Sequence, residues 1–468
     1  MKKILLLTAT IAMLNVVIAP AQENTFYFME NLAQRNYYNP AHKPDYNITI
    51  GLPGISSNYI SYNNSGFSYS DLIRRRAEDD SLELNLSTFY QNLGNKNNLT
   101  TTQQIDLFHL TFKVNPAIYL STHLSSKTIA NWMYPGDLVG FLVNGNAESI
   151  GETMELHSEI DASGYLEYGI GATIVVDRHL TLGARFKFLK GVADVSTRKS
   201  DFSINTNQDY HISLSGNADI RTSGLEQFTG DSFELNNFED AMGLLANPGF
   251  AIDLGGTYQL DDKWEFGVSI IDLGFINWKN NTYQYLIDPA TAKFTFRGVE
   301  IDQLLEGDED VFDNMLDSLG NNFEMEEIAI GAYKSWLPSR FYLNSNYTIT
   351  ENLDAGLLLF GEKYSGGIKG GAGVNVTKEF GRLLSMSVNY SVRSRSYNNL
   401  GAGVSFNFSP LQLYLAGDNL LGAPLALLGS QELNPYLNNM KVFNFRFGIN
   451  LIFNKEMKET KLPDDQIY

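Results

Sequence analysis

The sequence predicts an all-β fold, a single antiparallel transmembrane β-barrel of about 14 strands with an N-terminal plug segment and long extracellular loops. Three observations predict it. An export signal opens the chain, alternating apolar segments recur in pairs around tight turns, and mostly long connections join one pair to the next. Composition agrees, because 29 Phe, 25 Tyr and 40 Gly against 13 Pro favour strands joined by turns.

Composition also excludes several classes of protein. Hydrophobic residues make up 43% of the 468 residues and charged residues 19%, which is too apolar for disorder and too interrupted for a helical membrane bundle. The formal net charge of -19 argues against a nucleic-acid-binding surface. The absence of cysteine removes thiol catalysis, disulfides, Cys-based zinc sites and lipoprotein attachment.

Residues 1–21 have the pattern of a secretory signal peptide. Lys2 and Lys3 precede an apolar stretch from Ile4 to Ile18, and a small-residue site with Ala19 and Ala21 comes directly before Gln22. The apolar stretch is shorter than the ~20 residues that a membrane helix needs. Cleavage after Ala21 is therefore expected. An exported chain without membrane helices is either soluble outside the inner membrane or a barrel in an outer membrane.

From residue 105 onward the alternating segments form six predicted hairpins around turns rich in Asn, Asp and Pro. They are Ile105–Val114 with Ala117–Ser126, Met154–Val176 with His179–Val195, Pro248–Leu260 with Trp264–Phe275, Arg340–Ile349 with Leu353–Gly361, Gly367–Thr377 with Leu383–Arg393, and Leu400–Phe408 with Leu411–Ala416. An opening strand at Tyr46–Leu52 and a closing strand at Lys441–Asn454 complete 14. A count of 12 to 16 stays open, since residues 210–222 and 283–298 fit either further strands or loop hairpins.

The connections between hairpins are mostly long. They cover residues 127–153, 196–247, 276–339 and 417–439, with shorter ones at 362–366 and 394–399. Short turns at one end and long loops at the other are typical of outer-membrane barrels. We therefore expect the protein to lie in the outer membrane of a Gram-negative bacterium, with both of its termini on the side of the short turns.

The closing strand carries the strongest local signal. Apolar residues occupy every second position from Phe443 to Phe453. Ten steps of ~3.3 Å at a 45° tilt project to ~24 Å, close to the ~25 Å apolar band of an outer-membrane barrel. A β-sandwich strand with the same alternation is the soluble alternative.

Part of this strand resembles the recognition signal of the bacterial barrel-assembly machinery. Its residues are Arg446, Gly448, Leu451 and Phe453. In the commonest form of the signal the chain ends at the last aromatic residue, whereas a charged tail over residues 455–468 follows here. We expect that tail to be a periplasmic extension.

Four further segments resemble one family of proteins. They are Asn39-Pro40-Ala41 followed by Tyr46–Pro53, Pro135–Leu138 followed by Gly145-Asn146, Ile270–Trp278, and Leu413–Leu420. Together they are similar to the Bacteroidetes outer-membrane barrels of the FadL/PorV-like group, especially a branch known only as a domain of unknown function. The resemblance implies a 14-stranded barrel with an inward-folded plug. FadL-type relatives pass hydrophobic molecules, and PorV-type relatives serve a secretion machinery.

The predicted organisation follows from these observations. After the signal peptide, residues 22–45 form a plug, residues 46–454 the barrel, and residues 455–468 the tail. A barrel of this size has a lumen wider than its own side chains fill, so an internal plug is also expected physically. Phe26–Pro44 is the candidate segment.

No catalytic, metal or cofactor motif is present in the sequence. The six histidines lack metal-ligand spacing, no Gly-x-Ser-x-Gly occurs, and the glycine run at 366–373 lacks the Gly-Lys-Ser/Thr order of a phosphate loop. His109 and His123 face each other across a predicted hairpin, and we interpret them as structural. The sequence therefore predicts a protein that is not an enzyme and needs no cofactor.

Residues 299–327 hold 11 acidic side chains and no lysine or arginine. Apolar residues at helical spacing predict an amphipathic helix over Glu300–Leu319 in an outer loop. Its apolar face is Ile301, Leu304, Leu305, Phe312, Met315 and Leu316. It is interpreted as a lid over the barrel mouth or a cation-bridged contact with lipopolysaccharide, with a solvated loop helix as the alternative.

The leading functional hypothesis is a plugged barrel that binds or transports hydrophobic small molecules. The alternatives are a protein-docking barrel for secretion or surface attachment, using the loops 196–247 and 276–339, and a structural envelope barrel. The expected partners are outer-membrane lipid, the barrel-assembly machinery, and either a hydrophobic small molecule or a secretion-system protein, with no nucleic acid.

Overall fold

The computed structural model describes residues 24–76, 81–145, 149–225, 247–297, 320–364, 367–393, 396–419 and 441–455. Several predictions fall outside these ranges. They concern the signal-peptide site at Ala19, Ala21 and Gln22, the acidic loop helix from Ile301 to Met315 and Leu316, and the tail beyond Lys455.

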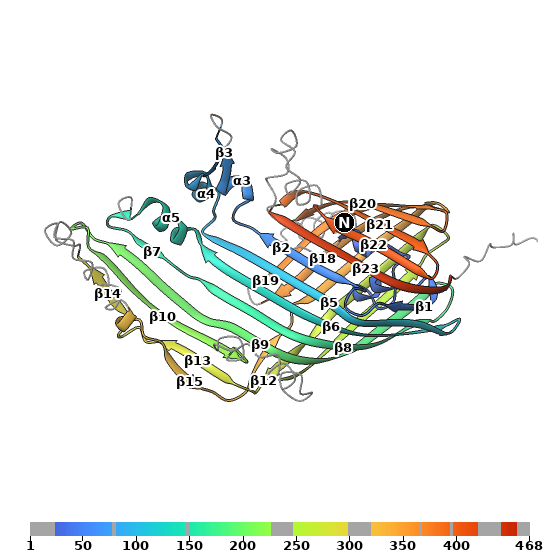
Figure 1. Cartoon of the computed structure of the whole chain (residues 1–468), viewed down its shortest axis with the longest axis horizontal. Helices are drawn as coiled ribbons and strands as arrows, with labels where there is room; N and C mark the ends of the chain where they lie inside the picture. The colour runs from blue at the N-terminus through green and yellow to red at the C-terminus, as the bar shows by residue number, and fades with distance from the viewer. Residues whose placement is uncertain are drawn as a thin grey trace, which may run out of the picture.

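The described strands close into one antiparallel barrel (Figure 1). The first half of the wall is made by β1 (Tyr46–Gly51) with β2 (Asn58–Asn64), β5 (Lys96–Asn115), β6 (Ile118–Pro135), β8 (Glu159–Val175), β9 (Leu180–Thr206), β11 (Pro248–Gln259) and β12 (Trp264–Trp278). The second half is made by β17 (Ser339–Thr350), β18 (Leu353–Tyr364), β19 (Gly367–Phe380), β20 (Leu384–Arg393), β21 (Ser396–Phe408), β22 (Leu411–Asp418) and β23 (Val442–Lys455). Because β1 and β2 both pair with β5 and with β23, they count as one interrupted strand, and the wall has the predicted 14.

Two strands of the wall are interrupted. The predicted opening strand Tyr46–Leu52 covers only β1, because residues 52–57 leave the ladder before β2 begins, and β2 was not predicted. The predicted strand Met154–Val176 is divided into β7 (Thr153–Glu155) and β8. Glu155 pairs with Ser203 and Asp161 pairs with Ser196. Between these two pairs β9 has one residue more than the opposite chain, so the ladder cannot continue unbroken there.

Beyond the barrel, several strands continue as an open sheet that we call the wing. It consists of residues 191–206 of β9, together with β7, β10 (Ile212–Ser223), β13 (Thr282–Ile287), β14 (Lys293–Phe296) and β15 (Glu326–Ala329). β10 pairs with β9 on one side and with β13 and β14 on the other, and β15 pairs with β13. Figure 1 shows the wing at the end away from the short turns.

The wing corrects one prediction and resolves another. The connections 196–247 and 276–339, predicted as loops, are partly strand. The segments 210–222 and 283–298, for which strands and loop hairpins were both left open, contain β10, β13 and β14, which lie outside the barrel wall. Polar side chains pair across the strands of the wing. The hydroxyl oxygens of Ser203 and Ser215 lie 3.1 Å apart, and the Gln284 side chain donates to Asp219 at 2.8 Å.

Several short elements lie at the same end of the barrel as the wing. They are α3 (Tyr69–Leu72), β3 (Ile73–Arg75), β4 (Leu82–Leu84), α4 (Leu86–Gln91) and α5 (Gly136–Asn144). Strand β16 (Tyr333–Trp336) pairs with β12 and lengthens the wall there.

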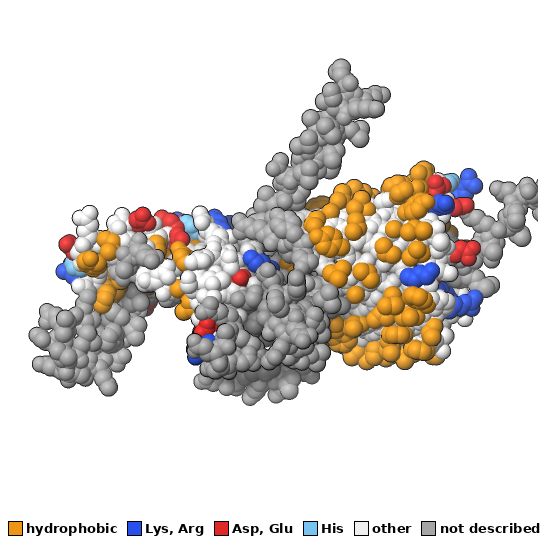
Figure 2. Space-filling model, turned by 90° about the horizontal axis from the view of Figure 1, so that it is seen from above, with side chains coloured by type: hydrophobic (Ala, Val, Ile, Leu, Met, Phe, Trp, Pro, Cys, Tyr) orange, Lys and Arg blue, Asp and Glu red, His pale blue; other side chains and the backbone are white. Residues whose placement is uncertain are grey.

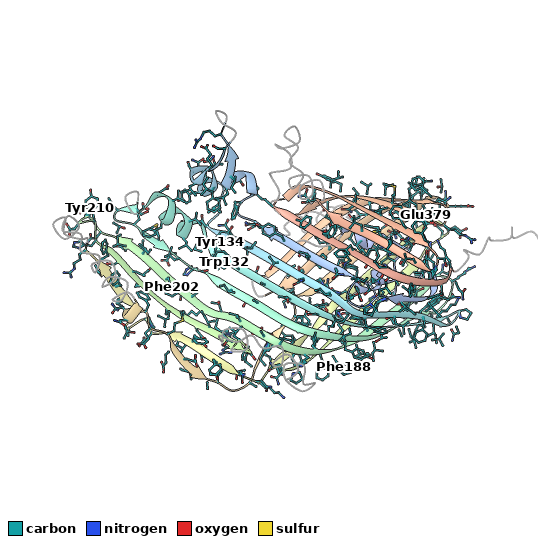
Figure 3. All side chains as sticks on the ribbon, in the orientation of Figure 1. Trp132, Tyr134, Phe188, Phe202, Tyr210 and Glu379 are labelled. Carbon is teal, nitrogen blue, oxygen red and sulfur yellow. The ribbon has the colours of Figure 1, made fainter. Side chains whose placement is uncertain are left out.

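The outer surface of the barrel is an apolar band (Figure 2). On β23 the predicted alternation holds, with Phe447 and Phe453 exposed while Asn444 and Asn450 are fully buried inside. Phe188 points outward from β9, and Trp132 and Tyr134 lie near the end of β6 (Figure 3). Trp264 near the short turns and Trp336 at the other end give the band aromatic edges, the pattern of a membrane-spanning barrel. Among the described residues, no helix is long and apolar enough to cross a bilayer.

The main hydrophobic core lies inside the barrel. Residues 24–45, which we call the N-terminal segment, contain α2 (Asn24–Tyr27) and the 3-10 helix η1 (Ala33–Tyr37). Phe26, Tyr27 and Met29 have no exposed surface. They pack with inward side chains of the wall, which are Ile271, Tyr342, Leu358, Phe360, Tyr414 and Ala416.

Candidate functional site

The Asn39-Pro40-Ala41 motif fixes the C-terminal part of the N-terminal segment to the wall. The Asn39 side-chain oxygen accepts the Ala41 backbone N–H at 2.9 Å, and Thr173 donates its hydroxyl to the Pro40 carbonyl at 2.6 Å. The backbone comes so close that a Cβ at Gly183 would collide with Pro40, and one at Gly255 would collide with the Asn39 side chain. Glycine at both wall positions therefore allows the motif to dock.

The other end of the segment is held by Asp418. This buried carboxylate on β22 accepts the backbone N–H of Asn24 at 2.9 Å and of Thr25 at 3.3 Å, and the Thr25 hydroxyl at 2.6 Å. The Asn444 side chain donates to the same carboxylate at 3.0 Å. A carboxyl group has two oxygens that can accept several hydrogen bonds at once, so Asp418 is well suited to anchor residues 24 and 25.

Arg446 is the third anchor. Its guanidinium donates to the Ser57 hydroxyl at 2.5 Å and to the Tyr38 hydroxyl at 3.4 Å, and it lies over the Phe26 ring at 5.2 Å from the ring centre. Of the four residues of the predicted assembly signal, Arg446 therefore points into the lumen. A Cβ at Gly448 would collide with the Ser56 carbonyl, and Phe453 lies on the outer face.

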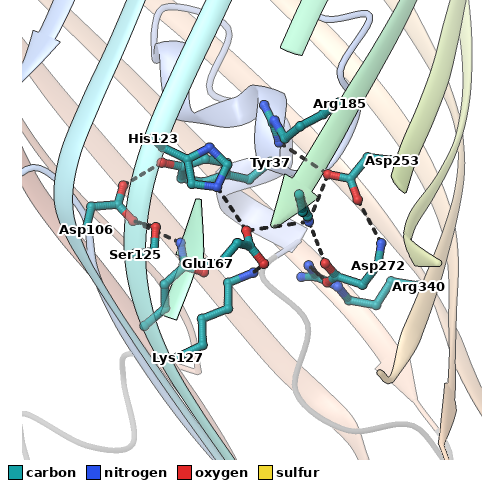
Figure 4. A network of polar contacts seen from close by, with 12 residues as sticks. Tyr37, Asp106, His123, Ser125, Lys127, Glu167, Arg185, Asp253, Asp272 and Arg340 are labelled. Carbon is teal, nitrogen blue, oxygen red and sulfur yellow. Dashed lines mark hydrogen bonds and ion pairs between the residues drawn. The ribbon is translucent and has the colours of Figure 1, made fainter. Parts of the chain in front are cut away.

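A network of buried charges crosses the lumen beside the segment (Figure 4). Lys187 is at its centre, with its ammonium 2.9 Å from Asp253, 2.5 Å from Asp272 and 3.6 Å from Glu167. Around it, Lys127 pairs with Glu167 at 2.8 Å, Arg340 with Asp272 at 2.5 Å, and Arg185 with Asp253 at 3.4 Å. Buried charges are tolerated when each one has a partner, and these ionic pairs join β6, β8, β9, β11, β12 and β17.

The N-terminal segment joins this network through Tyr37. The Tyr37 hydroxyl donates to Asp106 at 2.6 Å, Ser125 donates to the other oxygen of Asp106 at 2.8 Å, and Arg185 lies over the Tyr37 ring. His123, beside the ring, has its Nε2 2.9 Å from Glu167. His109 and His123 are directly paired across β5 and β6, and no cluster of three or more metal-ligating side chains occurs among the described residues.

A β-bulge in β12 places the acidic side chain that Lys187 and Arg340 share. Asp272 has φ 61°, and the register with β11 shifts between Ile252 and Leu254. The extra residue leaves Ile271 and Asp272 both buried inside, although strand neighbours normally face opposite sides. The Asp272 backbone N–H donates to Asp253 at 2.8 Å, which stabilises this unusual backbone conformation.

A cavity of about 360 Å³ lies against the neighbouring strands β6, β8 and β9. Apolar and small side chains form much of its lining, among them Ala162, Tyr165, Val192 and Leu225. Lys127 and Asp194 also line it. The Asp194 carboxylate accepts a hydrogen bond from the Tyr333 hydroxyl at 2.9 Å. The volume falls within the range of small-molecule sites, about 300–1,000 Å³.

A family model of unknown function, DUF5723, matches residues 40–418, which is most of the chain. The chain belongs to this DUF5723 family. A search of the curated proteins gives no match for this DUF5723 member. The match confirms the prediction of a family of unknown function.

The solved structures similar to this DUF5723 chain include two toluene transporters and a FadL homologue, each of low sequence identity. The Ralstonia pickettii toluene transporter TbuX has 8% identity and a TM-score of 0.39, over 91% of this chain and 95% of its own. A Pseudomonas aeruginosa FadL homologue has 10% identity and a TM-score of 0.41, over 94% of this chain and all of its own. The P. putida toluene transporter TodX has 9% identity and a TM-score of 0.39, over 91% of this chain and 95% of its own.

The structure of this DUF5723 member brings some of the predicted site residues together. Inside the barrel, Arg446 donates to Tyr38, the residue directly before the Asn39 motif. The charged network was not predicted, although its signal was present in the sequence. Lys127, Glu167 and Lys187 interrupt strands that otherwise alternate, and Asp272 lies inside the segment Ile270–Trp278.

Proposed function

We propose that this chain is an outer-membrane barrel of a Gram-negative bacterium that binds and transports hydrophobic small molecules without covalent chemistry. The observations that carry the proposal are a largely apolar cavity against the neighbouring strands β6, β8 and β9 and an N-terminal segment packed inside the barrel. In this proposal residues 22–45 are the plug and residues 46–454 the barrel. An apolar ligand gains by leaving water for such a cavity, whereas polar solutes meet a lumen already occupied.

The test is to fill the cavity. Gly164 lines it, and a Cβ there has no neighbour closer than 3.9 Å, so Gly164→Phe places a ring in the cavity without a backbone clash. Gly331→Phe is the matched control, since a Cβ at Gly331 also has open space and Gly331 does not line the cavity. Both variants are purified in nanodiscs and titrated with n-butylbenzene.

We expect Gly164→Phe to weaken n-butylbenzene binding at least tenfold and Gly331→Phe to leave it unchanged. A filled cavity with unchanged affinity would show that the ligand site lies elsewhere. Uptake of the same probe into proteoliposomes then separates binding from transport, because a binding protein that does not transport gives saturable binding without uptake.

The wing favours a second candidate function, docking of a protein partner as in PorV-like barrels. Strand β9 runs for 27 residues, far more than the ~9–11 that cross a membrane, and carries the wing outward from the barrel. Trp278 and Tyr333 are paired in register, so an Asn-Gly turn replacing residues 279–332 would close β12 and β16 as a hairpin. If docking is the function, this variant loses a copurifying protein and keeps n-butylbenzene binding.

We also propose that Gly448, Leu451 and Phe453, with Arg446, serve as the assembly signal. Phe453→Ala is expected to lower the amount of folded barrel in the outer membrane several-fold. Phe447→Ala is the matched control, because Phe447 is an outward aromatic residue of similar exposure on the same strand. Equal losses in the two variants would mean that membrane contact, rather than recognition, explains the effect.

A further inference from the structure

The side chains that open onto the 360 Å³ cavity lie on the outer face of the barrel wall. Gly164 pairs with Thr128 on one side and with Ala193 on the other, and all three line the cavity. Residues that pair directly across neighbouring strands share a face of the sheet. On β8, Tyr168 lies four positions from Gly164 and therefore on the same face. Tyr168 is 43% exposed and pairs with Phe188, which points outward (Figure 3).

Three further lining residues have their side chains on the inner face. They are Lys127, Tyr165 and Asp194. Tyr165 belongs to a buried apolar cluster. Lys127 pairs with Glu167 at 2.8 Å, and Asp194 accepts a hydrogen bond from Tyr333 at 2.9 Å. A ligand in the cavity therefore meets the small and apolar side chains of the opposite, outer face.

A β-bulge explains why the outer face is hollow here. Gly164 pairs with Ala193 but Tyr165 pairs with Gly191, so Val192 is an extra residue of β9 that bends the sheet locally. Glycine and alanine at positions 162, 164 and 193 leave the resulting space open. An apolar space that no side chain fills lacks dispersion contacts until another apolar group enters it.

The cavity lies near the outer edge of the apolar band. Gly164 is 11 positions from Val175, where β8 ends at its short turn, and 11 steps of ~3.3 Å at a 45° tilt project to ~26 Å. The apolar band of such a barrel is ~25 Å tall. Trp132, four positions beyond Thr128 on the same face of β6, is 39% exposed, and tryptophan favours the boundary between lipid and water. The cavity is thus at the depth of outer-leaflet acyl chains, with Trp132 on its headgroup side.

We propose that the cavity is a binding site for one acyl chain of an outer-leaflet membrane lipid, with the chain against Ala162, Gly164 and Ala193 and the headgroup beside Trp132. The inference rests on the proposed function and names the ligand class of the same cavity. The cavity is continuous with the lipid-facing surface, so acyl chains are the apolar groups that surround its opening. A chain inside the hollow contacts protein on more sides than a chain on the rest of the band, and it is therefore retained longer.

The first experiment counts the lipids that the full-length protein retains. Wild type, Gly164→Phe and Gly256→Phe are purified in detergent, incubated with dipalmitoylphosphatidylethanolamine and examined by native mass spectrometry. Gly256→Phe is the matched control, because Gly256 pairs with the outward Leu182, where a Cβ makes an ordinary contact, and does not line the cavity. We expect wild type and Gly256→Phe to retain one lipid and Gly164→Phe to retain at least tenfold less. Equal retention by all three would overturn the proposal.

The second experiment tests the face on which the cavity opens, and it needs no bulky substitution. The chain has no cysteine, so a bimane label can be attached in Gly164→Cys, in Tyr168→Cys and in Ser163→Cys, whose side chain shares the inner face with that of Asp194. Each labelled barrel is placed in nanodiscs with brominated acyl chains, which quench the labels that they touch. Folding is checked by heat-modifiable migration.

We expect the label at position 164 to be quenched as strongly as the label at position 168, and at least threefold more than the label at position 163. Equal quenching at positions 163 and 164 would overturn the outward placement of the cavity and the proposal with it.

The outcomes separate this inference from the proposed function. Binding of n-butylbenzene that is lost in Gly164→Phe, with no lipid retained by the wild type, would overturn the lipid inference and leave a site for other apolar molecules. Absence of both lipid and n-butylbenzene from the wild type would contradict the proposed function together with the inference.

Discussion

At the scale of single residues, the closed lumen depends on glycines that have no side chain where the N-terminal segment touches the wall. Gly255 and Gly256 are neighbours on β11 with opposite surroundings. A Cβ at Gly255 would collide with the Asn39 side chain, while one at Gly256 would lie 3.5 Å from Leu182, an ordinary contact. The pair therefore offers a matched test of the contact made by Asn39-Pro40-Ala41.

We expect Gly255→Ala to displace the Asn39 motif and open the lumen, while Gly256→Ala keeps it closed. Adding a methyl group to a well-packed core site costs about 1–3 kcal/mol of stability. This cost is enough to displace the docked segment without unfolding the barrel. The measurement is ion conductance in planar bilayers, where Gly255→Ala should show openings at least ten times as frequent as the wild type. Equal conductance of the two variants would mean that the motif does not seal the lumen.

The motif illustrates what single residues reveal in advance. Asn39, Pro40 and Ala41 were identified by resemblance, but their partners Thr173, Gly183 and Gly255 lie more than 130 positions away and carry no local signal. The same holds for Asp418, which bonds residues 24 and 25 across the whole chain. A local sequence pattern can therefore predict one residue of such a contact, but it cannot predict the partner that lies far away in the sequence.

At the scale of elements, the bulge in β12 is the feature on which the charged network depends. Asp272 accepts from Lys187 and Arg340, so Asp272→Ala would leave two buried cations short of an acceptor. Breaking a buried ion pair by removing one partner typically costs about 3–5 kcal/mol.

We therefore expect Asp272→Ala to lower the temperature at which the folded form is lost in heat-modifiable migration by several degrees. Asp272→Asn, which keeps an acceptor oxygen, should lose less. Asp201→Ala is the control, because Asp201 is an exposed carboxylate on the wing. A drop no larger than that of Asp201→Ala would contradict a structural role for the network.

The short turns give a prediction of pH dependence. Asp177, between β8 and β9, accepts the backbone N–H of His179 at 2.7 Å and of Leu180 at 2.8 Å, and these hydrogen bonds lower the pKa of its carboxyl. A carboxyl with a lowered pKa stabilises the fold above its unfolded value, about 3.9, and this stabilisation is lost as the pH falls through the folded value. Asp177→Ala should therefore unfold at a lower temperature than the wild type at pH 7, with the difference vanishing near pH 2.

Asp209→Ala, in the turn between β9 and β10, serves as the control for the loss of an exposed turn carboxylate. A difference between Asp177→Ala and the wild type that is as large at pH 2 as at pH 7 would contradict the role given to the carboxylate. The unfolding temperature is read from heat-modifiable migration at each pH.

The hairpins were predictable because their signals are local. Alternation and a turn residue such as Asp177 or Pro410 are visible within some twenty positions, and all six predicted hairpins appear in the barrel wall. The wing was only partly predicted. Strand β10 is rich in Ser, Thr and Asn, and the buried apolar cluster of the wing is small, with Ala218, Ile287 and Ala292. The wing strands are also joined by pairings such as Ala218 with Ile287 that are distant in sequence.

At the scale of the whole molecule, the closed barrel follows from an apolar outer surface and a lumen too wide to be filled by the wall alone. Both were predictable from the sequence, and the N-terminal plug over residues 22–45 stays a prediction. The balance of charges inside was not, because ionic pairs such as Lys187 with Asp253 and Asp272 form only when six strands are in register.

The most direct test of the account is native mass spectrometry of the protein extracted gently from its own outer membrane. We predict one small apolar molecule bound per barrel in the wild type and in Gly331→Phe, and its loss in Gly164→Phe. A barrel that carries no small molecule, but instead a stoichiometric protein partner that Gly164→Phe does not release, would contradict the central claim and support docking through the wing.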